Sequence, residues 1–405
     1  MHILFLTDNF PPEGNAPATR TFEHCSEWVK NKDVQVTVIT CVPNFPEGKV
    51  YSGYSNKLFQ KEVIEGINVW RVKTFISANE GIFKRSIDFL SFMFSSFIFG
   101  LFAKKVDCVI GTSPQFFTVI SSYGLAKLKR VPFIFELRDM WPASIAAVDV
   151  MKKGRIINIL ESVELFLYKK ADLIISVTRS FKTELIKKGI NEDKIRVVMN
   201  GVDLRRYQPA TIKDKDLAKI YGLKDKFVAG YIGTHGSAHA LDKIVYAAKI
   251  LINYPNIRII FAGGGAERIR ITELVKREKL HNIVMIPRQA KEDMPKLWSL
   301  CDVSLIHLKD VSLFRTVIPS KIFESMGMGL PIIISVPLGE ATKIVTESES
   351  GIVVPPESPK DLANAILKLN EPHLYQKLSN GSKNSANKYD RRVLAAKMLS
   401  HIKNI

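Results

Sequence analysis

The sequence predicts an α/β protein built from two doubly wound, Rossmann-like domains. Segments typical of strands and of helices alternate along almost all of the 405 residues, which is the pattern of βα units in a parallel sheet. The strand-like runs are short and rich in Val, Ile and Phe, as expected for strands buried on both faces. The alternation stops near residues 200–226 and then restarts, and two domains of ordinary size account for the length.

The first array of strands and helices begins at the second residue. Strands are predicted at 2–8, 34–40, 106–112, 132–137, 172–177 and 195–199. Helices are predicted at 17–31, 116–130 and 155–170. A β-hairpin interrupts this order at 62–75, because Glu65-Gly66 between two strand-like runs is a turn sequence.

The second array repeats the pattern after the break. Strands are predicted at 227–233, 258–262, 283–287, 302–307, 331–336 and 351–354, and helices at 241–253, 267–279, 293–300, 320–328 and 359–369. We expect an N-terminal domain at 1–205, a C-terminal domain at 206–385, and a final helix at 386–405 for which a return to the first domain is one option. Ligands of such sheets bind beyond the carboxyl ends of the strands, so the cleft between the domains is the expected site.

Composition and charge limit the possible classes of protein. Hydrophobic residues make up 46% and charged residues 24%, which excludes a disordered or fibrous chain. The net charge of +18 favours contact with phosphate, nucleic acid or an anionic membrane. The four cysteines lack metal-site spacing and fit a reducing cytosol. No secretory leader is expected, and the longest apolar candidate, Phe89–Ala103, has 15 uncharged residues, fewer than the roughly 20 that span a bilayer.

The stretch from 315 to 340 is the most informative about chemistry. Pro319-Ser320 can start a helix, and Lys321 and Glu324 then share one helical face near its N-terminus. Together with Arg315, a helix N-terminus and a lysine form a site for a phosphorylated ligand, and Glu324 could accept the hydroxyls of a ribose or sugar. By spacing alone, a surface ion pair on an ordinary helix is the simpler interpretation.

Several motifs together identify a family resemblance. The run Pro319-Ser-Lys-Ile-Phe-Glu324 is followed by Gly327, Gly329-Leu-Pro331 and Gly339-Glu340. This order resembles the nucleotide-sugar signature of retaining glycosyltransferases of family 4, which have the two-domain GT-B fold. In the first domain, Asp8-Asn-Phe-Pro-Pro-Glu-Gly14 with Arg20 resembles the family's first loop. Arg138-Asp-Met-Trp-Pro142 is similar to one branch, the N-acetyl-L-fucosamine transferases of bacterial O-antigen and capsule assembly.

One position departs from the family pattern. Many members carry a second Glu eight residues before the one that corresponds to Glu324, and the resemblance places it near the donor sugar's hydroxyls. Here that position is Thr316. Either the donor lacks a hydroxyl recognised by a carboxylate, as in a 6-deoxy or acetamido sugar, or a neighbour such as Asp310 takes over.

Other candidate donor-binding residues follow strands of the second domain. They are Gly233 and His235, the triplet Gly263, Gly264 and Gly265, then Arg288, Thr316, Pro319, Ser320 and Glu340. Glycine lets backbone N–H groups approach a nucleotide closely, although Gly-rich βα turns also serve plain geometry. A structural role for His235 and a solvated position for Arg288 are the competing interpretations.

In the first domain, Gly14 and Asn15 lie in a loop that we expect to face the cleft, or that is a plain βα connection. Asp139 ends a buried strand and is the candidate polar group on the acceptor side, with helix capping as its alternative. The resemblance also implies a catalytic histidine in this domain, and neither His2 nor His24 occupies a matching position.

Residues 82–105 carry seven phenylalanines, flanked by the basic pairs Lys84-Arg85 near the start and Lys104-Lys105 at the end. This composition favours a helix lying against an anionic membrane, with a buried core helix as the alternative.

The resemblance implies a retaining glycosyltransferase that moves a sugar from a nucleotide diphosphate, UDP by preference, to a lipid-linked saccharide. We expect Lys321 and Arg315 to neutralise the leaving diphosphate, and Glu324 and Asp139 to complete the catalytic set. No cofactor and no metal are expected, since the DxD-like run Lys213-Asp-Lys-Asp216 reads as a solvated charge run in the linker. The expected location is the cytoplasmic face of the membrane. A nucleotide-sugar epimerase of GT-B fold is the alternative enzyme, and a basic nucleic-acid or membrane binder ranks last because no nucleic-acid module is present.

Overall fold

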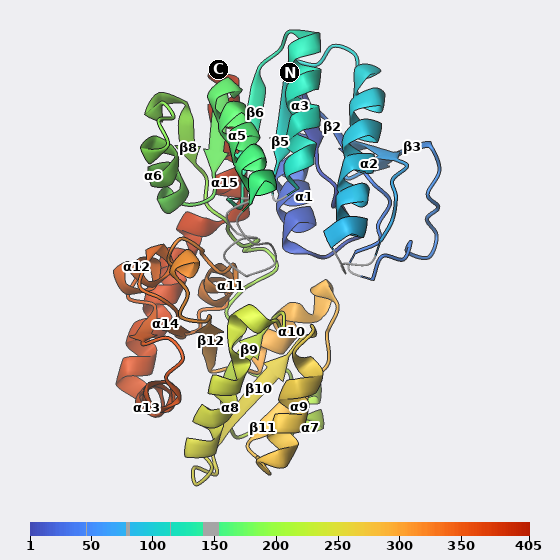
Figure 1. Cartoon of the computed structure of the whole chain (residues 1–405). Coiled ribbons are helices and arrows are strands. Elements are labelled where there is room, and N and C mark those ends of the chain that lie inside the picture. Colours follow the sequence, from blue (N-terminus) through green and yellow to red (C-terminus); the bar gives the residue numbers. More distant parts are fainter. Residues whose placement is uncertain (46, 78–81, 114, 141–153) are drawn as a thin grey trace. The chain divides into compact units, whose positions relative to one another are not determined.

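The computed structural model describes residues 1–45, 47–77, 82–113, 115–140 and 154–405. Trp141 and Pro142 of the branch-specific motif lie outside these residues. The chain forms two compact units, one of Met1–Met199 with Arg392–Ile405 and one of Asn200–Arg391 (Figure 1). Each unit contains a Rossmann-like sheet with helices, which confirms the predicted α/β fold class.

The sheet of the first unit has the order β3-β4-β2-β1-β5-β6-β7-β8. Its strands are β1 (His2–Leu6), β2 (Gln35–Thr40), β3 (Phe59–Ile64), β4 (Ile67–Val72), β5 (Cys108–Thr112), β6 (Phe133–Leu137), β7 (Leu173–Ser176) and β8 (Ile195–Val197). All pairs are parallel except β3 and β4, which form the predicted hairpin. Glu65 and Gly66 turn it with φ values of 46° and 81°, the left-handed conformation that a tight hairpin turn requires.

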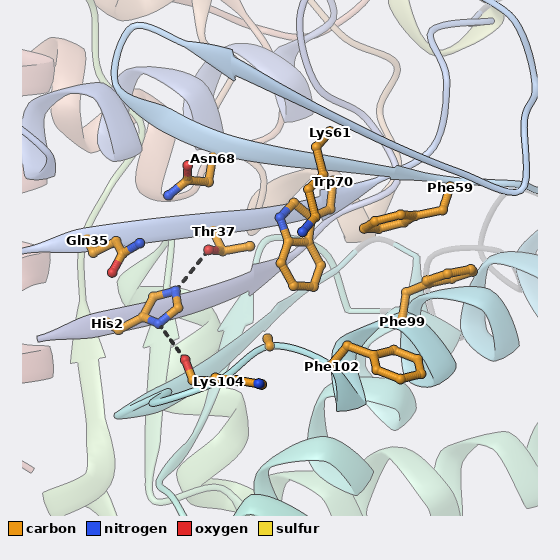
Figure 2. A pocket seen from close by; sticks show the side chains of 11 residues that line it. His2, Gln35, Thr37, Phe59, Lys61, Asn68, Trp70, Phe99, Phe102 and Lys104 are labelled. Atoms are coloured by element: carbon orange, nitrogen blue, oxygen red, sulfur yellow. Dashed lines mark hydrogen bonds between the residues drawn. The ribbon is translucent and has the colours of Figure 1, made fainter.

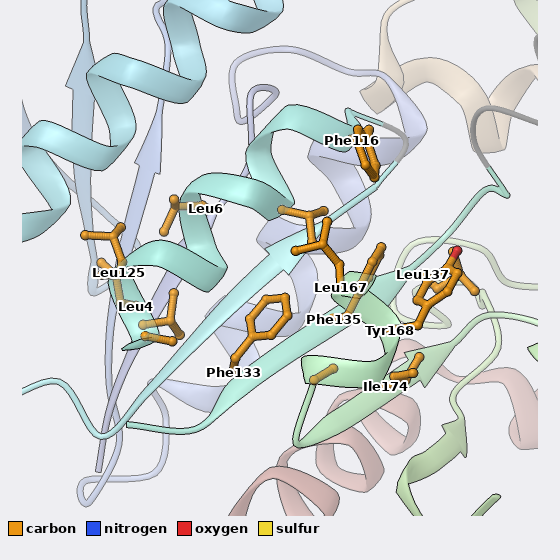
Figure 3. Close-up of a cluster of buried hydrophobic side chains, with 14 of the residues drawn as sticks. Leu4, Leu6, Phe116, Leu125, Phe133, Phe135, Leu137, Leu167, Tyr168 and Ile174 are labelled. Atoms are coloured by element: carbon orange, nitrogen blue, oxygen red, sulfur yellow. The ribbon is translucent and has the colours of Figure 1, made fainter. Parts of the chain in front are cut away.

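Helices of this unit are α1 (Ala16–Trp28), α2 (Ile82–Leu101), α3 (Phe116–Lys129), α5 (Arg155–Lys170), α6 (Arg179–Lys187) and α15 (Arg391–Lys403). Helices α2 and α3 pack against each other, and Phe59 of β3 stacks on Phe99 of α2 with ring centroids 4.7 Å apart (Figure 2). Figure 3 shows the core beneath them, where Leu4 and Leu6 of β1 lie near Phe133 and Phe135 of β6.

The last helix, α15, belongs to the first unit although it ends the chain. Trp28 on α1 donates its indole N–H to the carbonyl of Ala395 at 2.8 Å, and both residues are buried. Met398 and Ile402 are buried in the same core cluster as Trp28. This apolar face explains why the chain returns to the first unit after passing through the second.

The sheet of the second unit is entirely parallel, in the order β11-β10-β9-β12-β13-β14. Its strands are β9 (Phe227–Ile232), β10 (Ile257–Ala262), β11 (Ile283–Ile286), β12 (Val303–His307), β13 (Ile332–Ser335) and β14 (Gly351–Val354). Its helices are α7 (Lys215–Ile220), α8 (Leu241–Ile250), α9 (Arg268–Arg277), α10 (Met294–Ser299), α11 (Lys321–Gly327), α12 (Glu340–Glu347), α13 (Pro359–Leu369) and α14 (Pro372–Ala386).

In the run Lys213-Asp-Lys-Asp216, Lys215 and Asp216 are exposed as predicted, but Lys213 and Asp214 are half-buried and bonded. Asp214 caps helix α7, because its side chain accepts the N–H of Leu217 at 3.0 Å. Lys213 forms an ion pair with Asp302 at 2.6 Å. Lys213 and Asp214 are therefore bonded to the start of the second unit and do not belong to a solvated linker.

Candidate active site

The loops after β9, β10 and β11 are bonded to one another at the carboxyl edge of the second sheet. Gly233 donates its N–H to Ala262 at 2.8 Å, and Gly263 donates to Ile286 at 3.3 Å. His235 donates its backbone N–H to Gly264 at 2.8 Å. The three loops thus form one hydrogen-bonded edge, which is where sheets of this kind bind ligands.

Two of the three glycines after β10 are required by close packing. Gly263 has φ +136°, and a Cβ there would lie 2.0 Å from the carbonyl oxygen of Gly233. Gly265 has φ +141°, and a Cβ there would lie 2.6 Å from the carbonyl oxygen of His235. The geometric interpretation accounts for both of these positions. Gly264 has no such constraint, since a Cβ added to it would lie 4.0 Å from the Cβ of Arg288.

Lys321, the first residue of α11, reaches back to the loop after β9. A Cβ on Gly233 would lie 2.5 Å from Lys321 Cε, so only glycine leaves room for the lysine stem. The Lys321 ammonium lies 3.6 Å from the centre of the buried Tyr231 ring, a cation–π contact. Burial lowers the pKa of Lys321 to about 7, and the nearby Glu324 charge opposes this shift. No hydrogen-bond or ion-pair partner of this ammonium occurs within the described part of the chain.

Glu324 lies one helical turn after Lys321 and is half-buried. Its carboxylate accepts the indole N–H of Trp298, on α10, at 3.2 Å. Lys321 and Glu324 lie three residues apart in α11, as predicted, and Trp298 binds the Glu324 carboxylate.

His235 does not present its imidazole to solvent. The side chain is fully buried and packs against Tyr231 and Phe261, with ring centroids 5.9 and 6.1 Å away. Burial, followed by the charges of Arg268 and Lys321, lowers the pKa of His235 to about 4, so the ring is neutral at pH 7. This geometry favours the structural role, with the His235 backbone rather than its ring at the loop edge.

Sequence reasoning missed Arg268, the first residue of α9. Its guanidinium donates to the carbonyls of Gly263 at 2.7 Å and of Ile286 at 3.0 Å. Arg268 therefore ties the glycine loop to the end of β11. A lone arginine three residues after a glycine run carries no recognisable signal, so only the fold identifies it.

The other predicted residues of this unit lie in the segments that follow β11, β12 and β13. Arg315 is exposed at the end of a short 3₁₀ turn, and its carbonyl lies 2.0 Å from where a Cβ of Gly339 would be. Gly339 directly precedes α12, whose first residue, Glu340, is nearly buried. Thr316 donates its hydroxyl to Leu313 at 2.9 Å. Arg288 is exposed two residues after β11.

Pro319 and Ser320 directly precede α11, as predicted, and both are half-buried. Ser320 takes the N-cap position, but its side chain makes no capping hydrogen bond there. The hydroxyl is therefore not used by the first turn of the helix.

The first unit has a polar cluster at the carboxyl ends of its strands. Arg20 donates to Glu136 at 2.8 Å in a fully buried ion pair, and also to the carbonyl of Met199 at 2.8 Å. Burial alone would raise the pKa of Glu136, but Arg20 and then Arg138 outweigh it and hold the pKa below its ordinary value. Asp139 is half-buried, and its backbone N–H donates to Ser113 at 3.2 Å.

The loop before α1 ends in a helix cap. Asn15 accepts the N–H of Ala18 at 2.8 Å, and Gly14 is exposed, with nothing within 4 Å of the place that a Cβ would take. Asn15 therefore has a structural role, as expected if this loop is a plain βα connection. Gly14, in contrast, is open to a ligand. Neither histidine of this region presents its imidazole to the loop before α1. His24 is buried against Trp28, and His2 is the first residue of β1, at the amino end of that strand.

Three carboxyl groups near this loop escaped the sequence analysis as site candidates. Burial first, and then their mutual repulsion, raises the pKa of Glu13 and of Asp88 to about 7. Burial likewise raises the pKa of Asp8 to about 6. Perturbed acids at the carboxyl end of β1 mark this edge as chemically distinct.

Comparison with known proteins gives a family match for each of the two units. The family model for Glycosyltransferase Family 4 matches residues 18–206, and that for glycosyl transferases group 1 matches residues 212–385. "Putative colanic acid biosynthesis glycosyl transferase WcaI" of Escherichia coli K12 is 27% identical over 90% of this chain and 91% of its own length.

Solved structures share the fold over the whole chain. HepE of Anabaena, solved in complex with UDP, superposes with a TM-score of 0.73 at 17% identity and covers 100% of both chains. Sucrose-phosphate synthase of Thermosynechococcus elongatus gives a TM-score of 0.78 at 15% identity, covering 100% of this chain and 98% of its own. These matches give the epimerase alternative no support. The chain is a glycosyltransferase of GT-B fold, with a family 4 domain followed by a glycosyl transferases group 1 domain.

Proposed function

We propose that this protein transfers a sugar, with retention at the anomeric carbon, from UDP to a lipid-linked saccharide in bacterial surface polysaccharide synthesis. The single observation that supports a nucleotide-diphosphate donor is the position of the Lys321 ammonium. It lies beside the Gly233 loop and has no carboxylate partner among the described residues. The UDP complex of HepE and the name of WcaI support the nucleotide and the pathway class.

The leaving diphosphate is the group that gains charge during transfer. In this proposal Lys321 neutralises it, helped by Arg315 and Arg288, which are exposed cations in loops after β12 and β11. Glu324, held by Trp298, accepts hydroxyls of the ribose or the donor sugar. These cations supply the electrophilic assistance, so we propose a reaction without a resident metal or cofactor. No protein nucleophile is assigned.

Our proposal for the type of donor sugar rests on Thr316. Its hydroxyl is engaged with Leu313, so it offers neither a charge nor a free donor where many family members have a carboxylate. We therefore propose a deoxy or acetamido sugar, N-acetyl-L-fucosamine among them. Asp310, which is exposed, remains the competing candidate for that role.

The membrane contact involves α2, which has two different faces. Phe92, Ser96 and Gly100 are buried, and Gly100 packs so closely on Leu125 of α3 that its Cβ would lie 2.4 Å away. The opposite face exposes large apolar side chains: Phe94 at 59%, Ile98 at 51%, Leu101 at 44% and Phe102 at 66%. The buried face fits the core-helix interpretation of residues 82–105, and the exposed apolar face supports the proposed lipid contact.

No helix in the described part of the chain is long and apolar enough to cross a bilayer. The exposed apolar stripe and its basic ends instead support a peripheral contact with anionic lipid at the cytoplasmic face.

The test is transfer from radiolabelled UDP-, GDP- and dTDP-sugars to bacterial membrane lipid. Wild-type protein should label the lipid with a UDP-sugar, and Lys321→Ala should not, while the exposed-lysine control Lys224→Ala should. A folded protein that labels nothing with any donor would contradict the proposal. Formation of a new nucleotide sugar from UDP-N-acetylglucosamine alone would favour epimerisation instead.

A further inference from the structure

The first unit has a cavity of about 610 Å³ that the proposed transfer does not use. It lies on the sheet face toward α2, where side chains of β1, β2, β3 and β4 meet the end of that helix (Figure 2). His2 and Gln35, the first residues of β1 and β2, line one side. A strand of five residues rises about 3.3 Å per residue, so this place is on the order of 15 Å from the carboxyl edge.

Aromatic rings form one wall of this cavity. Phe59, Trp70, Phe99 and Phe102 line it, and Figure 2 shows their rings gathered on one side. Phe102 is 66% exposed and continues into the exposed apolar face of α2. The cavity therefore opens onto the surface that we propose to contact lipid.

Two lysines supply the charges of the lining, Lys61 beside the aromatic wall and Lys104 away from it, near His2 (Figure 2). Lys61 lies 4.7 Å from the Trp70 ring centre, and Lys104 is exposed at the end of α2. The lining contains no carboxylate, and neither lysine has an ion-pair partner within the described ranges. The nearby Asp107 accepts the backbone N–H of His2 at 2.6 Å. The positive charge of these two lysines is thus left for a ligand.

We infer that this cavity binds an anionic bilayer phospholipid, with its phosphate between Lys61 and Lys104 and the start of its acyl chain against the aromatic wall. The lining lacks a carboxylate and combines two lysines and four aromatic rings with the amides of Gln35 and Asn68. Cations without a counter-charge beside an apolar wall suit a phosphate group that is attached to acyl chains. The distance from the carboxyl edge separates the bound lipid from the reacting saccharide. This inference deepens the proposed membrane contact and rests on it.

The probe is monomeric dihexanoyl phosphatidylglycerol, titrated into the full chain by calorimetry, with dihexanoyl phosphatidylcholine as the uncharged-headgroup comparison. We expect saturable one-to-one binding of the anionic lipid and much weaker binding of the zwitterionic one. Each lysine near an anionic group is worth about five-fold in affinity, so K61Q/K104Q should weaken binding roughly 30-fold. The control K224Q/K360Q removes the same charge from exposed lysines of the other unit and should change nothing.

A second variant, Asn68→Phe, fills the cavity without changing charge and should also abolish binding. Equal binding of both lipids, or binding unaffected by both cavity variants, would overturn the inference. Co-sedimentation with phosphatidylglycerol vesicles separates the two proposals. If wild type and K61Q/K104Q bind the vesicles equally well, the membrane contact does not depend on the cavity. If wild type binds the short lipid but not the vesicles, the cavity site is supported and the proposed membrane contact is wrong.

Discussion

The Lys321 ammonium lies 3.6 Å from the centre of the Tyr231 ring, which joins the start of α11 to strand β9. Tyr231 is fully buried and donates its hydroxyl to Thr234 at 2.7 Å, so the ring cannot swing away. The lysine is thus held beside the loop of Gly233 before any ligand arrives. A preorganised cation of this kind stabilises charge that develops on a leaving group.

Replacing Lys321 by alanine should remove this cation without unfolding the unit. Loss of one preorganised electrostatic contact costs about 10²–10³-fold in rate, and we expect that loss in kcat/KM for sugar transfer. UDP should also stop raising the Tm of the variant in a thermal-shift assay, whereas Lys224→Ala should behave as wild type. An unchanged UDP response in Lys321→Ala would show that the diphosphate binds elsewhere.

Gly233→Ala tests the same contact from the other side. Its Cβ would lie 2.5 Å from Lys321 Cε and the backbone has φ +142°, so the lysine stem must shift and the backbone is strained. Strain of this type costs about 1–3 kcal/mol, and we expect a lower Tm together with weaker UDP binding. The control is Gly222→Ala, where φ is +64° and the added Cβ meets nothing within 4 Å, so the backbone is strained there, away from Lys321. Normal UDP affinity in Gly233→Ala would mean that the position of Lys321 is unimportant.

The strands and the turn at Glu65-Gly66 were predictable because they depend on local patterns. The same holds for the common face of Lys321 and Glu324, which needs only helical spacing. The approach of Lys321 to Gly233 depends on which strands are neighbours. The order of alternating βα units along the chain does not fix the order of strands in the sheet.

Burial was the second quantity that sequence reasoning lacked. His235 had equal claims to a structural and a binding role until the fold enclosed its ring between Tyr231 and Phe261. The pairing of Arg20 with Glu136 joins residues 116 positions apart, so no local spacing could reveal it. Helix α7 was missed because its charged first turn resembles a linker, although Asp214 is an ordinary cap.

The pKa of Lys321, lowered to about 7, makes UDP binding depend on pH. The side chain is charged below this pKa and neutral above it, so affinity for an anion should fall as pH rises. Each pH unit above 7 should cost up to about ten-fold in affinity. Calorimetric Kd values for UDP between pH 6 and 9 measure this, and Lys321→Arg, which stays charged, should flatten the profile. Parallel profiles for the two proteins would exclude Lys321 as the titrating group.

The buried acids near β1 should make the protein less stable as pH rises. A salt-bridged carboxylate has the opposite effect. Burial raises the folded pKa of Asp88 to about 7 from an ordinary 3.8, so the folded state holds a proton that the unfolded state loses. Its stabilising contribution is complete below about pH 4 and is lost as pH rises toward 7. Asp88→Asn removes this titration, and we expect its Tm advantage over wild type to grow from pH 5 to pH 8. A constant Tm difference across that range would contradict the shifted pKa.

Arg20 and Glu136 provide the last prediction, because their buried ion pair joins α1 to the end of β6. Arg20→Met leaves a fully buried carboxylate without its partner, which typically costs about 3–5 kcal/mol in the free energy of unfolding. The carbonyls of Met199 and Val198 also lose their donors. In R20M/E136L the unpaired charge is gone, so chemical denaturation should recover part of the loss but not all of it. If the double variant is no more stable than Arg20→Met, then the lost carbonyl contacts, and not the stranded charge, set the cost.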